Sequence, residues 1–261
     1  MTDVLGRIRA FERDLEQRLS TRTERCRFGT AYFHEGFPKR WDSNFVWTEP
    51  PLDGVDAEQL DADADDVLGR AGLAHRVIWV EDVAEGERLA PGFVDLGYEV
   101  DRDVVMVHVR EPDRWTDERA EEVDVASARA MWYVSNLEEE EGMRADDARM
   151  LADFLDVLVE RADGRFFGVR VDGDVVAGCQ LMVLGGVAQV EDVVTLTAHR
   201  GQGFARAVVL AAVRAAREGG ADLVYLGADD EDWPKQMYAK LGFDEAGRSY
   251  DFVRKPPDQR A

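Results

Sequence analysis

The chain of 261 residues is 45% hydrophobic and carries a formal net charge of −22 at pH 7. This length and apolar content suit one large domain or two of ordinary size, each with a true core. The acidic balance argues against general binding to nucleic acid or to an anionic membrane, because both would be repelled on approach. We therefore expect a soluble globular protein whose partners are small molecules or cations.

No apolar run approaches the roughly 20 residues that span a bilayer, and residues 1–19 lack the apolar core of a signal peptide. A cytoplasmic location is therefore expected. The two cysteines, Cys26 and Cys179, stand far apart without metal-ligand spacing. Neither a disulfide framework nor a metal site is predicted.

The first half of the chain repeats the second in weaker form, at an offset of 145 residues. Gly97 lies over Gly242 (242 − 97 = 145) and Phe93 over Tyr238 (238 − 93 = 145). The segments that match at or within about a residue of this offset are 56–72 with the helix that begins near 203, 75–80 with 221–227, and 87–109 with 232–253. The economical interpretation is two copies of one unit, the first of them partial.

A boundary is expected in residues 110–122, which are charged and contain a proline. We therefore predict two domains, a degenerate copy at residues 1–112 and a complete copy at residues 113–261.

The second half predicts an ordered series of helices and strands. Apolar residues at three- and four-residue spacing indicate two helices, and Asp172-Gly173 is a strong hairpin signal between two strand patterns. The predicted elements are helices at 126–140, 145–162, 203–218 and 233–242, and strands at 164–173, 174–186, 187–196, 221–229 and 248–255. The helix at 203–218 is apolar enough to pack on a sheet.

The stretch "AHRGQGFARAVV" at 198–209 places two glycines where a strand passes into a helix. The first N–H groups of a helix lack intrahelical partners, and the aligned peptide dipoles make that end positive. Gly201 and Gly203 permit close approach of an anion, and Arg200 adds a full charge. In the first copy Asp56 and Glu58 stand in place of these glycines, so that copy cannot bind phosphate.

Three cofactor classes use such corners. A nucleotide-hydrolysing phosphate loop requires Gly-Lys-Ser/Thr, and no lysine follows Gly203. A dinucleotide fold would place a third glycine where this chain has Arg206, so that match is weak.

The third class is coenzyme A. "RGQGFA" resembles the R/Q-x-x-G-x-G/A signature of the GNAT superfamily of acyl-CoA N-acyltransferases, and "MYAKLGF" resembles that family's xYxxxGF element. The resemblance covers about residues 120–253. It implies an α/β (α+β) GNAT fold, with a mixed, largely antiparallel sheet that splays between two strands and is flanked by helices. The two copies would share this fold, the first only in part.

The resemblance also implies a binding site for acetyl-CoA as cosubstrate. Main-chain groups of the strand before the corner would hold the pantetheine arm, and the corner would hold the diphosphate. The residues concerned are Val193, Val194 and Thr195 for the first role, and Arg200, Gly201, Gln202, Gly203, Phe204 and Ala205 for the second.

For catalysis, Tyr238 aligns with the family tyrosine that protonates the leaving thiolate. Transfer from a phenol of pKa about 10 to a thiolate of pKa about 8.5 is uphill by roughly 2 kcal/mol, which a hydrogen bond or a lowered phenol pKa would offset. Packing is the alternative role for Tyr238. Glu191 is favoured over Asp192 as the base, on the premise that strand neighbours point to opposite faces. A salt-bridge role for Glu191 stays open.

Four further features allow both a functional and a structural interpretation. His199 is better explained as an exposed turn residue than as a base. Trp132 and Tyr133 would line an acceptor pocket or pack in the core. The glutamates at 138–141 form a solvated face or rim the acceptor site and attract a cation.

These observations predict an N-acetyltransferase acting on a primary amine of a small molecule or peptide. The alternatives are a non-catalytic acyl-CoA sensor or assembly module, and a transferase of a longer acyl group. The chain is expected to be a monomer, as a pseudo-dimer of its two halves, or a homodimer.

Overall fold

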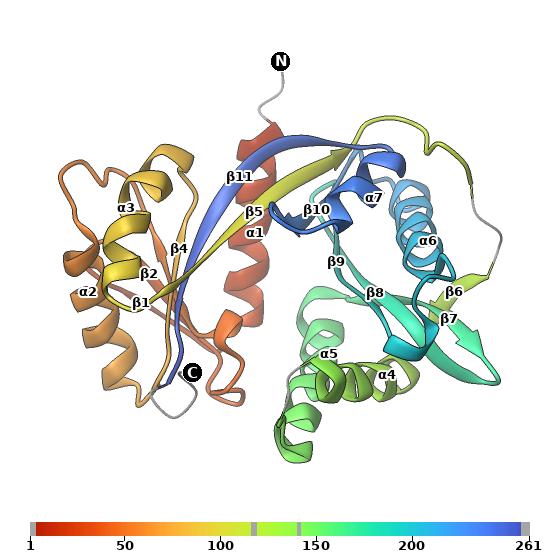
Figure 1. Ribbon diagram of the computed structural model, residues 1–261, viewed down its shortest axis with the longest axis horizontal. Coiled ribbons are helices and arrows are strands. Elements are labelled where there is room, and N and C mark those ends of the chain that lie inside the picture. Colours follow the sequence, from red (N-terminus) through yellow and green to blue (C-terminus); the bar gives the residue numbers. More distant parts are fainter. Residues whose placement is uncertain (1–3, 116–118, 140–141, 257–261) are drawn as a thin grey trace. The chain divides into compact units, whose positions relative to one another are not determined.

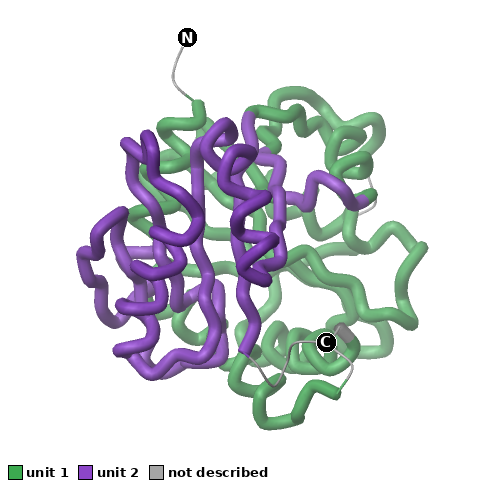
Figure 2. Tube along the Cα trace, turned by 60° about the vertical axis from the view of Figure 1, so that its left-hand side comes forward, with its two compact units in different colours: residues 1–15, 106–227, 233–246 green, residues 16–105, 228–232, 247–261 purple. Residues whose placement is uncertain are grey.

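The computed structural model describes residues 4–115, 119–139 and 142–256 (Figure 1). The chain divides into two compact units, each built from separate stretches of sequence (Figure 2). Unit 1 comprises residues 1–15, 106–227 and 233–246, and unit 2 comprises residues 16–105, 228–232 and 247–261. Four elements contribute residues to both units: α1 (Val4–Leu19), β5 (Glu99–His108), β10 (Leu223–Asp229) and β11 (Phe243–Arg254).

Unit 1 contains a sheet in the order β10-β9-β8-β7-β6 with helices on both faces (Figure 1). Its remaining elements are β6 (Ala120–Val123), α4 (Val125–Glu139), α5 (Ala145–Ala162), β7 (Arg165–Val171), β8 (Asp174–Leu184), β9 (Val187–Thr195), η2 (Thr197–His199), α6 (Phe204–Glu218) and α7 (Pro234–Lys240). Pairing is antiparallel from β6 to β9 and parallel between β9 and β10. The predicted mixed, largely antiparallel sheet is confirmed.

Two neighbouring residues of β8 show how the helices cover this sheet. A side chain at Gly178 would meet Met131 and Trp132 of α4. The thiol of Cys179 instead points to α6, where it donates to the carbonyl of Val208 at 3.4 Å. Because successive side chains of a strand point to opposite faces, α4 and α6 cover opposite faces of the sheet.

The predicted hairpin between β7 and β8 is confirmed. Val171 and Asp174 are paired, which leaves a loop of Asp172 and Gly173. Both loop residues have positive φ, 52° and 99°, as the two-residue turn that matches strand twist requires.

The strands of unit 2 follow the order β1-β2-β3-β4-β11-β5 within the 11-stranded sheet of the described chain. The remaining elements of unit 2 are β1 (Arg22–Arg25), β2 (Gly29–Phe33), η1 (Trp41–Ser43), β3 (Phe45–Thr48), α2 (Ala57–Arg70), β4 (Arg76–Val80) and α3 (Val83–Asp95). The helices α2 and α3 pack on one face, over a core in which Phe93 stacks on Phe252 with ring centroids 4.1 Å apart.

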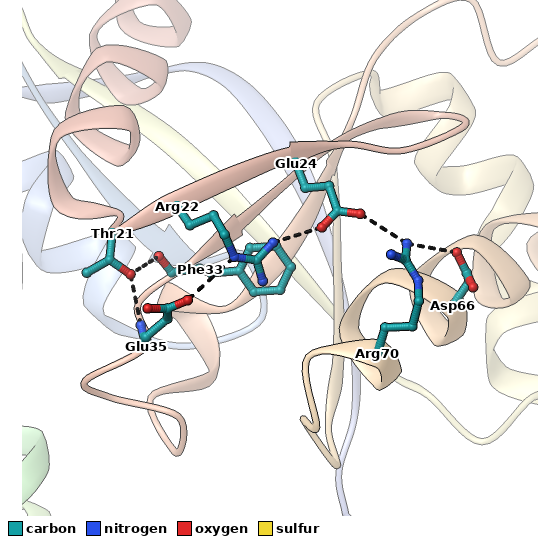
Figure 3. A network of polar contacts seen from close by, with 7 residues as sticks. All are labelled: Thr21, Arg22, Glu24, Phe33, Glu35, Asp66 and Arg70. Atoms are coloured by element: carbon teal, nitrogen blue, oxygen red, sulfur yellow. Dashed lines mark hydrogen bonds and ion pairs between the residues drawn. The ribbon is translucent and has the colours of Figure 1, made fainter.

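Ion pairs link α2 to β1 on the surface of unit 2 (Figure 3). Arg70 of α2 lies between Asp66 and Glu24, with nitrogen–oxygen distances of 3.0 Å to each. Glu24 also pairs with Arg22, whose guanidinium lies 3.7 Å from the centroid of the Phe33 ring. These exposed pairs each contribute little, so the apolar core carries most of the stability of this unit.

The helices and strands recur at the expected offset. In chain order α2, β4, α3 and β5 correspond to α6, β10, α7 and β11. Gly97 and Gly242 both have positive φ, and Phe93 and Tyr238 are both buried. The two halves of the chain therefore share one order of elements.

The compact units differ from the predicted division at residues 112 and 113. The C-terminal part of β11, from the second copy, pairs with β4 in unit 2, and Tyr250 lies opposite Val80. Residues 106–108, at the end of the last strand of the first copy, belong to unit 1. The copies thus exchange parts of their final strands, so a single cut in the sequence does not separate the units.

No helix in the described part of the chain is both long and apolar enough to cross a membrane.

Candidate functional site

The strands β9 and β10 of unit 1 pair at one end and separate at the other. Their ladder runs from Val187 opposite Leu223 to Gln189 opposite Tyr225. The strand β9 continues to Thr195 and β10 to Asp229, yet within the described chain no further pair joins them. Unpaired main-chain N–H and C=O groups need partners, so this gap suits an extended ligand with amide groups.

Thr195, at the open end of β9, carries a buried hydroxyl. No described residue forms a hydrogen bond with its Oγ1. Buried polar groups in native proteins are nearly always hydrogen-bonded, so this hydroxyl is suited to a ligand in the gap. The predicted pantetheine residues Val193, Val194 and Thr195 all lie in the part of β9 that pairs with β8 but not with β10.

The glycine corner directly follows the gap. Gly201 and Gly203 have φ of 77° and 78°, and both are exposed. Gly203 is the N-cap of α6, and no described side chain caps that helix. The first N–H groups of α6 therefore have no described side-chain partner and are suited to an anion.

The remaining predicted cofactor residues surround this corner. Gln202 is exposed between the glycines, while Phe204 is buried and begins α6. Arg200 is exposed, and its Nε donates to the carbonyl of Thr195 at 3.1 Å. This bond holds a guanidinium between the end of β9 and the corner.

The equivalent corner in unit 2 is closed. Asp56 is the N-cap of α2, and its carboxylate accepts a hydrogen bond from the main-chain N–H of Gln59 at 2.9 Å. A cavity of about 410 Å³ at this helix end is lined by Arg27, Asp56, Glu58, Gln59, Ala62, Asp63 and Asp66. The cavity has four carboxylates and one arginine in its lining, so it repels a phosphate.

Tyr238 of α7 is buried in unit 1. Burial raises its pKa, and the nearby Glu191 and Cys179 raise it further. The phenol therefore keeps its proton at neutral pH, and the lowered phenol pKa considered above is not found. The same surroundings would also raise the pKa of the thiol that leaves. The difference between the phenol and thiol pKa values, which decides the proton transfer, therefore changes less than the phenol pKa alone.

A bulge in β9 changes the faces of the two candidate bases. The register between β8 and β9 shifts between Gly178 and Gln180, and Asp192 has a φ of 52°. Gln180 lies opposite Glu191, but its side-chain amide donates to the carboxylate of Asp192 at 2.6 Å. Both carboxylates therefore lie on the face that α4 covers, and the premise of opposite faces is wrong.

The two carboxylates differ in their partners. Asp192 accepts a second hydrogen bond, from the indole N–H of Trp132. Glu191 accepts one from the side-chain amide of Gln189 at 2.8 Å and lies near Tyr238. The negative charge of Glu191 acts on the phenol of Tyr238, so the two residues predicted to be catalytic lie in the same part of unit 1.

The remaining candidates are placed as follows. Trp132 is buried, with its ring edge against Phe166, so it packs in the core and also reaches Asp192. Tyr133 is half-buried beneath the guanidinium of Arg149. His199 is half-buried in η2. Glu138 accepts a hydrogen bond from the main-chain N–H of Thr197 at 2.8 Å, whereas residues 140–141 of the glutamate run lie outside the described residues.

The segment before β6 connects α6 with α7. Arg206 of α6 is buried and donates to the carboxylate of Asp113 and to the carbonyl of Arg114. The main-chain N–H of Asp113 donates to the carbonyl of Lys240 at 2.9 Å. Sequence reasoning treated this segment only as a linker, and no motif marks its role.

In the described residues no group of three or more His, Cys, Asp and Glu side chains is arranged to hold a metal ion. The described chemistry of this site consists of main-chain amides, hydroxyls, carboxylates and arginines.

Comparison with known proteins agrees with this fold. Residues 128–243 match the model of the Acetyltransferase (GNAT) family. Among solved structures, the chain is similar to a GCN5-related N-acetyltransferase from Kribbella flavida, at 20% identity over 98% of this chain and 97% of that one, with a TM-score of 0.62. No curated protein matches.

Two further structures share the fold. A functionally unknown conserved protein from Staphylococcus epidermidis ATCC 12228 has 15% identity, a TM-score of 0.68 and coverage of 91% of this chain and 94% of that one. A tandem GNAT protein from the clavulanic acid biosynthesis pathway has 15% identity, a TM-score of 0.51 and coverage of 76% and 69%. The latter accords with a chain made of two related halves.

The fold is shared with GNAT acetyltransferases, and residues 128–243, somewhat less than half of the chain, match the model of that family. This match supports acyl transfer in general.

Proposed function

We propose that the protein transfers an acetyl group from acetyl-CoA to a primary amine of a small molecule or peptide. The observation that carries this proposal is the gap between β9 and β10, which is followed directly by the N-terminus of α6, a helix end that no described side chain caps. An acyl-CoA presents an extended amide arm followed by a diphosphate, in the same order as these two features.

Main-chain groups of Val193, Val194 and Thr195 would bind the arm, and the hydroxyl of Thr195 would gain the hydrogen bond it lacks in the described chain. The N–H groups at 201–205 would bind the diphosphate, with Arg200 beside them. The fit rests on exposed glycines without a Cβ and on a helix end that no described side chain caps.

The reaction requires a neutral amine and a proton for the leaving thiolate. Glu191 is the proposed base, acting directly or through water, and Tyr238 is the proposed acid. The amine nitrogen forms a bond to the acetyl carbon as the carbon–sulfur bond breaks, and Tyr238 protonates the sulfur. The raised pKa keeps the phenol of Tyr238 protonated at neutral pH, so the proton is present when the thiolate leaves. Burial in the same surroundings also raises the pKa of the departing thiol, which offsets part of the cost of the transfer.

The amine acceptor is proposed from charge. A chain with a net charge of −22 attracts cations, and protonated primary amines are cations at neutral pH. Glu138 of α4, tied to the main chain at Thr197, and Glu191 place acidic groups in the same unit as the proposed cofactor site. Nucleic acid and anionic membranes are not proposed as partners, and the proposed location is the cytoplasm.

Thermal unfolding with different ligands tests the proposal. Acetyl-CoA at millimolar concentration is expected to raise the melting temperature, whereas NAD and ATP are not. Release of free CoA across an amine library then identifies the acceptor. The absence of any shift with acetyl-CoA would contradict the proposal.

The variant Tyr238→Phe separates an enzyme from a binding module. An enzyme should lose turnover by about 10²- to 10⁴-fold while keeping its affinity for CoA. A sensor or assembly module would show no turnover in the parent protein. A series of acyl-CoA chain lengths distinguishes acetyl transfer from transfer of longer groups.

A further inference from the structure

Arg119, in the segment before β6, lies against the glycine corner of unit 1. Its guanidinium carbon is 5.0 Å from the centroid of the Phe204 ring. Its Nη2 donates to the main-chain carbonyl of Gln202 at 3.4 Å. Arg119 is itself exposed, beside the N-terminal end of α6.

The contacts with Phe204 and Gln202 hold this guanidinium at the corner. Phe204 is buried and is the first residue of α6, so it is a rigid support for a stacked arginine. Gln202 lies between Gly201 and Gly203. A side chain bound to both Gln202 and Phe204 is held next to the main-chain N–H groups proposed to bind the diphosphate.

Arg119 belongs to a different part of the chain from the glycine motif. It precedes residues 128–243, which match the family, and is 83 residues from Gln202 in sequence. Together with Arg200 it places two arginines at one helix end of a protein with 54 acidic and 32 basic residues. Arginine is suited to phosphate, because its planar donors match two phosphate oxygens at once.

We propose that Arg119 is a phosphate ligand for the nucleotide part of coenzyme A. This inference rests on the proposed acyl-CoA function and adds a specificity-determining residue to it. Coenzyme A offers two phosphate sources near such a corner, the diphosphate and the 3′-phosphate of its ribose. Both share the chemistry that a stacked guanidinium recognises.

The test uses the variant Arg119→Gln and calorimetric titration with coenzyme A and 3′-dephospho-coenzyme A. Glutamine keeps a hydrogen-bond donor and an aliphatic stem over Phe204 but removes the charge. We expect the affinity of the variant for coenzyme A to fall by about 10- to 100-fold, the effect of one charge-assisted hydrogen bond. A loss confined to coenzyme A identifies the 3′-phosphate, and an equal loss with both ligands identifies the diphosphate.

Arg165→Gln is the matched control. Its guanidinium also lies over an aromatic ring, that of Phe167 at 5.3 Å, but its ion pair is with Glu122 and not with the corner. This variant should bind both ligands as the parent does. If Arg119→Gln also binds both ligands like the parent, the role of Arg119 is overturned while the proposed function stands. If the parent itself binds neither ligand, the proposed function fails.

Discussion

The indole N–H of Trp132 donates a hydrogen bond to the carboxylate of Asp192, joining the helix α4 to the bulge of β9. The side-chain amide of Gln180 donates to the same carboxylate at 2.6 Å. Asp192 has a φ of 52°, a conformation that is uncommon outside glycine, asparagine and aspartate. The two donors therefore hold the bulge at the place where β9 leaves β10.

Replacing Trp132 by phenylalanine should lower the free energy of unfolding by about 2–3 kcal/mol, because a charged acceptor loses one buried donor and the core loses volume. Urea denaturation measures the change. The control is Trp115→Phe, since Trp115 is 48% exposed and should contribute less than about 0.5 kcal/mol. Equal stability of the Trp132 variant and the parent would contradict the role of this hydrogen bond.

The bulge also decides how the two carboxylates should behave. Asp192 is engaged by Trp132 and Gln180, whereas Glu191 lies near Tyr238. Glu191→Gln should lower kcat/KM for the amine by about 10²- to 10⁴-fold and remove the acidic limb of the pH profile. Asp192→Asn should mainly lower stability. A larger loss of kcat/KM in the Asp192 variant than in the Glu191 variant would indicate that Asp192 is the base.

Thr195→Val tests the gap itself. The hydroxyl of Thr195 has no hydrogen-bond partner in the described chain, so its loss should leave the stability of the free protein unchanged or slightly raised. Affinity for acetyl-CoA should fall about 5- to 10-fold, as expected when one neutral hydrogen bond is lost. Thr48→Val is a contrasting control, because the hydroxyl of Thr48 donates to the carbonyl of Trp79 at 2.8 Å. That change should lower stability without affecting ligand affinity.

Much of the domain that carries the site could be predicted from the sequence. The helix expected at 145–162 is α5 (Ala145–Ala162), because apolar spacing and a terminal residue in the left-handed conformation both define its limits. The hairpin at Asp172-Gly173 follows from local turn chemistry. The internal repeat identifies which helix corresponds to α6, and so which corner carries Asp56 in place of an open turn.

Features that depend on pairing between distant segments could not be predicted. The alternation of apolar and polar residues along β9 does not reveal the bulge at Asp192, because one extra residue changes the face on which the following side chains lie. The repeat places β11 in the second copy, yet β11 pairs with β4 of the first copy. Strand propensity does not determine which strand is the partner. The strands between residues 22 and 48 are short, and β1 (Arg22–Arg25) is almost entirely polar, so no periodic signal marks it.

Gly203→Ala separates a conformational effect from a binding effect. At φ of 78° an alanine is strained by about 1–2 kcal/mol, although a Cβ would meet no described atom within 4 Å. Gly72 in unit 2 has the same φ of 78° and equally open surroundings, so Gly72→Ala should lower stability by a similar amount. Only Gly203→Ala should lower the affinity for acetyl-CoA, because the added methyl group lies at the proposed diphosphate site. A ligand affinity unaffected by Gly203→Ala would argue against that site.

Asp103 of β5 should make stability depend on pH in unit 2. Burial, together with the negative charges of Asp101 and Asp229, raises its pKa to about 6. Because this pKa is higher in the folded than in the unfolded chain, the folded state binds more protons, and stability falls as the pH rises from about 4 to about 7. At pH 7 the unfavourable contribution is about 2 kcal/mol after allowance for partial exposure.

Asp103→Asn should therefore raise the free energy of unfolding at pH 7 by about 1–2 kcal/mol and change it little at pH 4, where the carboxyl of the parent is protonated. Urea denaturation at both pH values measures the difference between variant and parent. Asp95→Asn, at the exposed C-terminal end of α3, is the control and should shift both values by less than about 0.5 kcal/mol. A gain that is the same at pH 4 and pH 7 would mean that the Asp103 variant acts through packing, because only a titrating carboxyl confines the gain to the higher pH.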